Sequence, residues 1–332
     1  MVVLLHESKR IPEGVTDLDS AALEKKESLI STLKQLYQKN GYRRVQTPIF
    51  EYYDLFLDIK GTIAKEKMIK LIDRDGKILV LRPDATIPIA RMVATNYQSK
   101  SSDIRLSYFT NVFRMNDREQ DLQNRELTQA GIELFGRSDV SADVEVIKLA
   151  INSMQELGFK DFKIDLGQAN YFKELVNLST ITEEQLQEIR TRIENKNVSE
   201  LQKILDEIDL DTTFKEAILS MPLLYGTPEV VLEKAEKLAL NDEMKHELDR
   251  LRKVYKKLSV EGYQQFLSLD LGLINHLNYY TGIIFQGFIK NYGKPVVLGG
   301  RYDQLTRQFG WDLPATGFGF YLDDLLSMMK VN

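Results

Sequence analysis

Cysteine is absent from the 332-residue sequence, and histidine occurs only three times. The absence of cysteine excludes disulfides, thiolate nucleophiles, iron–sulfur clusters and thiolate zinc sites. His6, His246 and His276 are widely separated, so we also expect no histidine-rich metal site. His246 lies off the apolar stripe of its expected helix, which favours a solvent-facing side chain.

Long hydrophobic runs are missing too, and neither sign of charge dominates. No apolar run approaches the roughly 20 residues of a membrane span. The first ten residues lack the basic region and the cleavage site of a signal peptide. Lys and Arg number 44 against 49 Asp and Glu, a net charge of −5, so no overall basic excess indicates nucleic-acid binding. We therefore expect a cytoplasmic protein without a membrane association.

The spacing of apolar residues predicts an α+β fold, with a mixed, mostly antiparallel sheet flanked by helices. A length of 332 residues corresponds to about two domains. Helices are expected over 19–40 and 141–157, after Pro83, and at the end of the chain with Leu322, Leu325, Leu326 and Met329 on the buried face. Strands are expected over 42–51, 78–82, 104–113, 125–135, 278–289 and 296–298. Pro48 lies inside the first strand, which must therefore lie at an edge, a bulge or a chain interface.

In contrast to the rest of the sequence, residues 170–262 form a succession of helix-like segments with few strand signals. Thr182 with Gln185, and Ser199 with Gln202, have the spacing of capping boxes, and Thr227-Pro228 marks another helix start. We interpret 170–262 as a helical insertion subdomain. Residues 1–169 and 263–332 would then form the core.

The expected strand 125–135 has two different faces. Thr128, Ala130, Ile132 and Leu134 share one face, whereas the other carries Arg125, Leu127, Gln129, Gly131 and Glu133. The second face is either solvated or the floor of a polar pocket, in which Gly131 would leave room for a ligand.

Four segments concentrate unusual polar residues. They are LRPDAT (81–86), the strand–loop–strand carrying Arg114, Arg125, Gln129 and Glu133, NYYTGIIF (278–285) and GGRYDQL (299–305). A guanidinium at a strand end, such as that of Arg114, suits a phosphate or a carboxylate. Each segment alone is typical of a turn or a solvated strand end, but four in this order need another explanation.

In order and spacing, these segments resemble the core of class II aminoacyl-tRNA synthetases, and specifically histidyl-tRNA synthetase, from about residue 10 to residue 326. GYRRVQTPIFE is similar to the first class II motif, whose proline lies at the dimer interface; Pro48 would be that residue. IRLSYFTNVFRMN with RELTQAGIELFG resembles the second motif. LDLGLINHLNYYTGIIF resembles a segment peculiar to the histidyl enzymes, and LGGRYDQL with GFGFYLDDLL resembles the third motif and its approach.

The resemblance breaks at the residues that would bind ATP. Arg114 keeps the place of the second-motif arginine, but the acidic residue two positions later is Asn116. Asn275 stands where the histidyl enzymes have a carboxylate-activating arginine. Asp324 stands for the third-motif arginine of a Gly-Leu-Glu-Arg run. Since removing one preorganised charge commonly costs about 10²–10³ in rate, we expect no adenylation and no catalytic residues.

The amino-acid side of the pocket is better kept. By the resemblance, Asp84 and Thr86 would hold a substrate ammonium, with Arg114 close by. Gln129, Glu133 and Tyr280 would surround the amino acid and its imidazole, with Tyr279 nearby. The resemblance thus implies a histidine-binding pocket formed by Asp84, Thr86, Arg114, Gln129, Glu133, Tyr279 and Tyr280, with no metal and no cofactor.

A synthetase-like chain without these arginines, and with no room after the third motif for an anticodon-binding domain, resembles the regulatory subunits of ATP phosphoribosyltransferase, the first enzyme of histidine biosynthesis. The resemblance implies a non-catalytic subunit that self-associates as a class II-like dimer. It would assemble with a short catalytic subunit into a hetero-octamer, activate it and confer feedback inhibition by histidine, which acts as the effector.

Two other functions remain open at this point. The first is a free-standing synthetase-like enzyme that activates an amino acid as its adenylate; Asp324 counts against it. The second is an RNA or tRNA binder that uses a basic strip, for example Lys9-Arg10, Arg43-Arg44 and Lys253 with Lys256-Lys257. The acidic total and the expected lack of an anticodon-binding domain make tRNA an unlikely partner.

Overall fold

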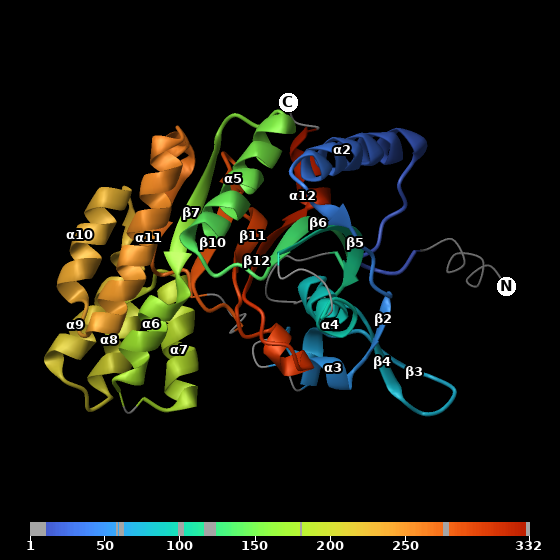
Figure 1. Cartoon of the computed structure of the whole chain (residues 1–332). Helices are drawn as coiled ribbons and strands as arrows, with labels where there is room; N and C mark the ends of the chain where they lie inside the picture. Colours follow the sequence, from blue (N-terminus) through green and yellow to red (C-terminus); the bar gives the residue numbers. More distant parts are fainter. Residues whose placement is uncertain are drawn as a thin grey trace, which may run out of the picture.

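A large sheet with helices on both faces forms the centre of the computed structural model (Figure 1). The structure describes residues 11–57, 59, 63–98, 103–115, 124–179, 181–274 and 279–329. Within these residues the large sheet has nine strands in the order β1-β5-β6-β12-β11-β10-β7-β9-β8. Only the pairs β1·β5 and β7·β9 are parallel among them. The predicted α+β class with a mostly antiparallel sheet is therefore confirmed.

The strands of this sheet come from the whole length of the chain. Their bounds are β1 Arg43–Arg44, β5 Ile104–Phe113, β6 Glu126–Phe135, β7 Phe162–Gln168, β8 Tyr225–Gly226, β9 Leu267–Asp270, β10 Ile283–Ile289, β11 Pro295–Arg301 and β12 Ala315–Tyr321. A second, three-stranded antiparallel sheet consists of β2 Phe50–Tyr52, β4 Ile78–Leu81 and β3 Lys70–Ile72. Its β3–β4 hairpin projects from the body of the molecule (Figure 1).

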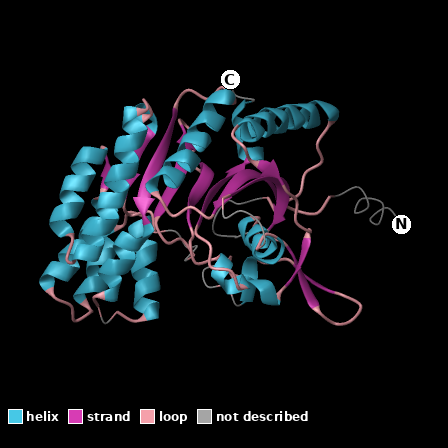
Figure 2. Cartoon of the chain, in the orientation of Figure 1, coloured by secondary structure: helices cyan, strands magenta, loops and turns pink. Residues whose placement is uncertain are grey.

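Helices pack against the sheet, and a further group of helices lies beside one end of it (Figure 2). Against the core lie α2 Ser20–Lys39, α3 Asp54–Leu57, α4 Thr86–Asn96, α5 Val140–Glu156 and α12 Leu322–Met329. Between β7 and β9 the chain forms α6 Ala169–Asn177, α7 Glu183–Glu194, α8 Val198–Asp206, α9 Thr212–Ser220, α10 Pro228–Leu238 and α11 Asp242–Val260. We call this group the α6–α11 block. Short 3₁₀ turns are η1 Lys65–Lys67, η2 Met221–Leu223, η3 Gln264–Phe266 and η4 Thr306–Phe309.

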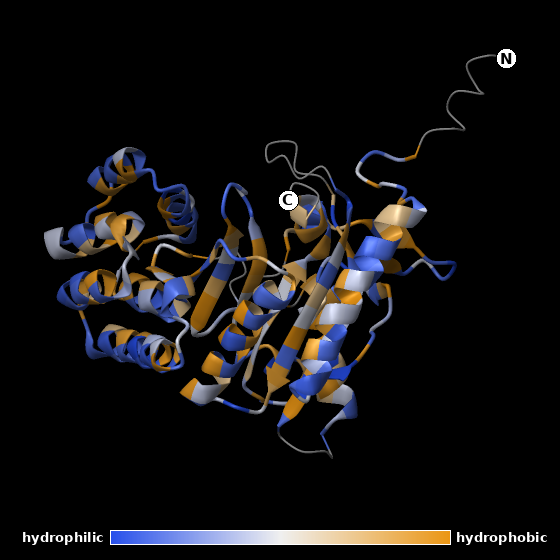
Figure 3. Cartoon of the chain, turned by 90° about the horizontal axis from the view of Figure 1, so that it is seen from above, coloured by the Kyte–Doolittle hydropathy of each residue, from blue (hydrophilic) through white to orange (hydrophobic). Residues whose placement is uncertain are grey.

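Apolar side chains pack on both faces of the sheet. Ala130, Ile132 and Leu134 of β6 pack on one face with α2 and α5, and this core continues into the α6–α11 block. Ile87, Ile89 and Val93 of α4 belong to the core on the other face. Hydrophobic residues lie along the strands, and the helices carry both hydrophobic and hydrophilic residues (Figure 3).

Local sequence explains where several elements begin and end. The Asp19 side chain accepts a hydrogen bond from the Ala22 amide at 2.8 Å and caps α2. Gly41, with φ +83°, ends that helix in the left-handed conformation that glycine adopts without strain. The predicted helix over 19–40 is therefore confirmed. The capping box of Thr182 and Gln185 at the start of α7 is also confirmed.

Four expectations need correction. The strand expected over 278–289 begins only at Ile283, as β10, so Tyr279 and Tyr280 precede it. The single strand over 42–51 is two short strands, β1 and β2, which pair in different sheets on either side of Pro48. Ser199 does not cap α8, because the Asn197 side chain accepts the Glu200 amide at 3.1 Å and takes the cap position. Met329 is exposed rather than buried. His246, in contrast, is exposed as expected.

Candidate functional site

Glu133 on β6 is the most deeply buried of the carboxylates predicted for the site. Its side chain is 1% exposed. Thr86 donates a hydrogen bond to Oε1 at 2.8 Å, and the Tyr302 hydroxyl donates to Oε2. Burial raises the pKa of Glu133 to about 8, although the two hydroxyl donors lower it. A cation placed beside this carboxyl would favour its ionised form.

Asp84 and Thr86 are presented to Glu133 by the start of α4. Asp84 Oδ1 accepts the Ile87 amide at 2.9 Å, which fixes the turn that leads into the helix. Pro88 follows in the first turn, where its missing amide donor is not needed. Asp84 is itself buried, and burial raises the pKa of its carboxyl while the charge of Arg114 opposes the rise.

Three buried tyrosines lie next to the two carboxylates. The rings of Tyr279 and Tyr280 are 4.8 Å apart, and Tyr302 meets Tyr279 edge-on at 5.9 Å between ring centroids. Burial raises the pKa of all three hydroxyls well above the ordinary value, so they act as neutral hydrogen-bonding groups. We refer to Asp84, Thr86, Glu133, Tyr279, Tyr280 and Tyr302 as the carboxylate–tyrosine cluster.

Tyr108 occupies the space that the sequence assigned to a ligand at Gly131. Gly131 lies between Tyr108 on β5 and Gly319 on β12 in the strand register. A Cβ atom on Gly131 would lie 2.5 Å from the Tyr108 hydroxyl and 2.1 Å from the Phe318 carbonyl oxygen. The glycine therefore makes room for the Tyr108 ring, which forms the floor of the site.

Arg114 and Gln129 lie at the adjoining end of the site, next to Tyr321. Arg114 Nε donates to the Pro83 carbonyl at 2.8 Å, and Nη1 lies 3.4 Å from the Tyr321 hydroxyl. Gln129 is opposite Tyr321 in the register of β6 and β12. Asp84 and Arg114 are close enough to interact electrostatically, because the positive charge of Arg114 lowers the pKa of Asp84. The structure thus gathers all seven residues predicted for the pocket.

Comparison with known proteins places this chain in a family. The sequence model of the family described as histidyl-tRNA synthetase matches residues 14–325. A protein of Oceanobacillus iheyensis named ATP phosphoribosyltransferase regulatory subunit is 40% identical over 306 residues, 92% of this chain and 74% of that protein. One of the same name from Alkaliphilus metalliredigens is 40% identical over 315 residues, 95% and 79% of the two chains. This chain belongs to the family of ATP phosphoribosyltransferase regulatory subunits, which is histidyl-tRNA synthetase-like.

Three solved structures share the fold of this regulatory-subunit chain. A Bacillus halodurans protein described as an ATP phosphoribosyltransferase regulatory subunit/histidyl-tRNA synthetase superposes with a TM-score of 0.88 at 31% identity, covering 96% of this chain and 83% of that one. A histidine–tRNA ligase subunit of Alicyclobacillus acidocaldarius gives 0.81 at 25% identity, with 97% of both chains covered. Histidyl-tRNA synthetase of a Nostoc species gives 0.80 at 19% identity, covering 97% of this chain and 75% of that one, which shows a shared fold.

Asp324, which stands at the place of the third-motif arginine, hydrogen-bonds to Tyr292, and Arg114 is contacted by Tyr321. Asp324 Oδ1 accepts a hydrogen bond from the Tyr292 hydroxyl at 2.5 Å, in the connection between β10 and β11. Burial raises the pKa of Asp324. Tyr321, three residues earlier, lies beside Arg114 instead. Asn116 and Asn275 lie outside the described residues.

Tyr302, Tyr108 and Tyr321 are site residues that the sequence reading did not assign. Tyr302 lies within GGRYDQL, a segment singled out as a whole, so a signal for it was present. Tyr108 and Tyr321 could have been found only from their cross-strand neighbours, because Tyr108 faces Gly131 and Tyr321 faces Gln129. Their roles depend on pairing between strands far apart in the sequence.

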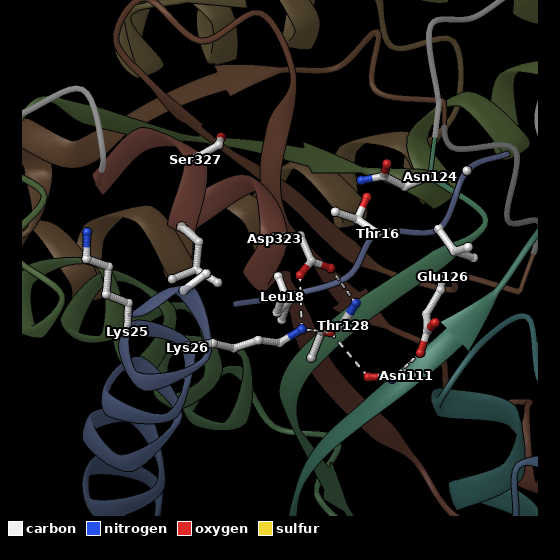
Figure 4. A pocket seen from close by; sticks show the side chains of 14 residues that line it. Thr16, Leu18, Lys25, Lys26, Asn111, Asn124, Glu126, Thr128, Asp323 and Ser327 are labelled. Atoms are coloured by element: carbon white, nitrogen blue, oxygen red, sulfur yellow. Dashed lines mark hydrogen bonds and ion pairs between the residues drawn. The ribbon is translucent and has the colours of Figure 1, made fainter. Parts of the chain in front are cut away.

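A cavity of about 320 Å³ lies on the opposite side of β6, where Thr128 points toward α2 and α12 (Figure 4). Lys26 donates to Thr128 Oγ1 at 2.5 Å and to Asp323 Oδ1 at 3.1 Å. Asp323 Oδ2 accepts the Thr128 amide at 2.7 Å. The chain of hydrogen bonds continues through Asn111 to Glu126. The charged and polar groups of this network are paired with one another by hydrogen bonds. This favours a structural role for the network, which joins α2, β6 and α12.

The described ranges contain neither a candidate metal cluster nor a candidate membrane-spanning helix. No group of three or more His, Asp or Glu side chains there has the arrangement of a metal site. No helix there combines the length and the apolarity that crossing a bilayer requires.

Proposed function

We propose that this chain is a non-catalytic regulatory subunit of ATP phosphoribosyltransferase. It activates a short catalytic subunit and makes that activity sensitive to feedback inhibition by histidine. The observation that carries the proposal is Glu133, a buried carboxyl held by Thr86 and Tyr302 in a chain whose relatives bear this name. A buried acid of this kind suits the imidazole of histidine, which can donate a proton or carry a positive charge.

The rest of the site supports histidine as the ligand. The buried carboxyl of Asp84 suits an α-ammonium group. In the described part of the chain, the hydrogen bonds of Arg114 use Nε and Nη1, so Nη2 can bind an α-carboxylate. Gln129 adds an amide, and the rings of Tyr279 and Tyr280 form an aromatic wall. The pocket would thus recognise all three charged or polar groups of one amino acid.

The same site argues against the alternative of an adenylate-forming enzyme. Tyr321 shares the guanidinium of Arg114, the one cation of the expected ATP-binding set that this sequence retains. The replacements at Asn275 and Asp324 remove two further positive charges from that set. Adenylation concentrates negative charge on phosphate oxygens, so a site without these cations would stabilise its transition state poorly.

A class II-like dimer through the region of Pro48 is part of the proposal. The small sheet beside Pro48 carries large apolar side chains that solvent reaches: Ile49, Phe50, Tyr52, Leu71, Ile72 and Ile78. Ile72 is 79% exposed and Phe50 52% exposed. Contiguous apolar residues on a soluble domain mark an interaction surface. A second copy covering this sheet would leave other surfaces for the catalytic subunit in a hetero-octamer.

RNA binding has weaker support in the described residues. Lys253 pairs with Asp249 at 2.5 Å, and Lys257 donates to Ser141 at 2.9 Å, so part of the expected basic strip is occupied within the protein. Lys9 and Arg10 lie outside the described residues. Binding that weakens steeply with salt would be the mark of an RNA partner.

The test is reconstitution with a short-form ATP phosphoribosyltransferase catalytic subunit. Phosphoribosyl transfer is assayed with and without this chain and histidine, and assembly is followed by sedimentation velocity. The proposal predicts co-sedimentation, a higher rate and a histidine-dependent loss of that rate. No association and an unchanged rate would refute it. ATP–pyrophosphate exchange across the amino acids would then test the adenylating alternative.

A further inference from the structure

The α6–α11 block reaches the carboxylate–tyrosine cluster directly through α6. Lys173 Nζ donates to the Tyr280 carbonyl at 2.5 Å, and Asn170 Nδ2 donates to the Thr281 carbonyl at 2.9 Å. The Ala169 amide also donates to the Gly282 carbonyl at 2.9 Å. The backbone that follows Tyr279 is thus held by the first two turns of α6.

A second connection runs from α11 through a buried group of charges. Arg250 Nη2 donates to Asp143 Oδ2 at 2.6 Å, and Arg301 Nε donates to Asp143 Oδ1 at 2.8 Å. Asp143 on α5 is 1% exposed and Arg301 on β11 is 2% exposed. Arg301 also donates to Asp303 Oδ1 at 2.8 Å. Because two arginines share one buried carboxylate, the loss of either would leave a buried charge poorly compensated.

Arg301 connects this ion group to two parts of the carboxylate–tyrosine cluster, Tyr302 and the backbone that follows Tyr280. It precedes Tyr302, the residue that donates to Glu133. Its carbonyl accepts the Thr281 amide at 2.7 Å. Its side chain passes so close to Gly282 that a Cβ there would lie 3.0 Å from Arg301 Cδ. A shift of Arg301 would therefore move Tyr302 and the 280–282 backbone together.

We propose that the α6–α11 block is a positioning element for the carboxylate–tyrosine cluster, acting through Lys173 on α6 and through Arg250 on α11. Ligand binding in the cluster should then strengthen the packing of the α6–α11 block on the core. That packing should strengthen ligand binding by the same factor, because coupling between two sites is reciprocal. A partner that binds the α6–α11 block would change the affinity of the cluster for its ligand through the same Lys173 and Arg250 contacts. The identity of the ligand, histidine, rests on the proposed function; the positioning contacts do not.

The first experiment compares Arg250→Gln with Arg252→Gln in the full-length chain. Arg252 lies on the same helix and pairs at the surface with Glu236 at 2.8 Å, so it is a matched control. Amide hydrogen exchange is measured without ligand, and histidine affinity by calorimetry. In Arg250→Gln we expect exchange over 279–284 and 300–305 to accelerate about tenfold and histidine affinity to fall about tenfold. Exchange in α2 should not change, and Arg252→Gln should match the wild type in both measurements.

Two further variants separate positioning from a general loss of stability. Arg250→Lys keeps a cation at Asp143 and should restore part of the exchange protection. Lys173→Met removes the contact to the Tyr280 carbonyl without touching the ion group, and it should accelerate exchange over 279–284 while leaving 300–305 protected. It also tests the proposal if Arg250→Gln does not fold.

Wild-type exchange over both segments in folded Arg250→Gln and in Lys173→Met would overturn the positioning role. If the wild type binds no histidine, the proposed function fails, while the exchange data still decide this inference.

Discussion

Replacing Glu133 by glutamine should remove a large pH dependence from the stability of the protein. The pKa of Glu133 is raised to about 8 by burial, against an ordinary value near 4.5. Because the pKa of Glu133 is higher in the folded than in the unfolded state, the unfolded chain releases this proton at a lower pH as the pH rises. The stability that the protonated group provides is complete below about pH 4.5 and is lost as the pH rises toward 8.

The size of the effect follows from the pKa difference. Each pH unit between the two pKa values costs about 1.4 kcal/mol of unfolding free energy. Between pH 5.5 and 8, the wild type should therefore lose about 3 kcal/mol relative to Glu133→Gln, whose amide keeps a hydrogen-bonding group of similar shape without a titratable proton. Distant buried carboxyls, such as Asp270, titrate in both proteins and cancel in this difference, whereas the charge of Asp84 is already among the causes that raise the pKa of Glu133.

Urea unfolding followed by circular dichroism at pH 5.5 and 8 measures the difference. Glu126→Gln is the control, because Glu126 lies on the same strand with an exposed side chain, and its stability should run parallel to that of the wild type at both pH values. A constant difference between Glu133→Gln and the wild type at the two pH values would refute the buried, protonated state of Glu133.

Three shorter predictions concern the site and the helix start. Glu133→Ala should weaken histidine inhibition of the reconstituted complex while sedimentation shows unchanged assembly; unchanged inhibition would place the effector site elsewhere. Gly131→Ala should destabilise the protein by about 1–3 kcal/mol in urea, because its Cβ would collide with the Phe318 carbonyl and the Tyr108 hydroxyl. Asp19→Ala should cost about 1 kcal/mol of thermal stability through the lost cap, whereas exposed Asp17→Ala should cost almost nothing.

Sequence patterns were reliable where the decisive interactions are local. The apolar stripe of α2 with the Asp19 cap, and the alternation of β6, depend on residues a few positions apart, and both are confirmed. Ser199 shows the limit of such patterns. It has the spacing of a capping box, but Asn197, two residues earlier, supplies an equally good acceptor, and the helix starts there.

The resemblance pointed to Asp84, Thr86 and Glu133, but the sequence did not assign the tyrosines that contact Glu133 and Arg114. Tyr302 binds Glu133 across 169 residues of sequence, and Tyr321 meets Arg114 across 207. No periodicity connects such distant positions. The segment around Pro48 is two strands rather than one for a similar reason, because strands far along the chain decide which sheet each half joins. The predicted edge position is confirmed for both halves, since β1 and β2 are each the end strand of their sheet.

The contact of Tyr321 with Arg114 changes how the departure from the synthetases is understood. In the Gly-Leu-Glu-Arg run of the resemblance, the arginine position is Asp324 and the glycine position is Tyr321. A lost cation weakens the binding of a phosphate, whereas a tyrosine in place of a glycine adds a ring where that glycine leaves space. Asp324 binds Tyr292, and Tyr321 binds the retained Arg114. On the proposed function, we expect the Tyr321 ring to hinder ATP binding in addition to the effect of the replaced cations. Restoring arginine at 324 alone should therefore not restore adenylate formation in ATP–pyrophosphate exchange.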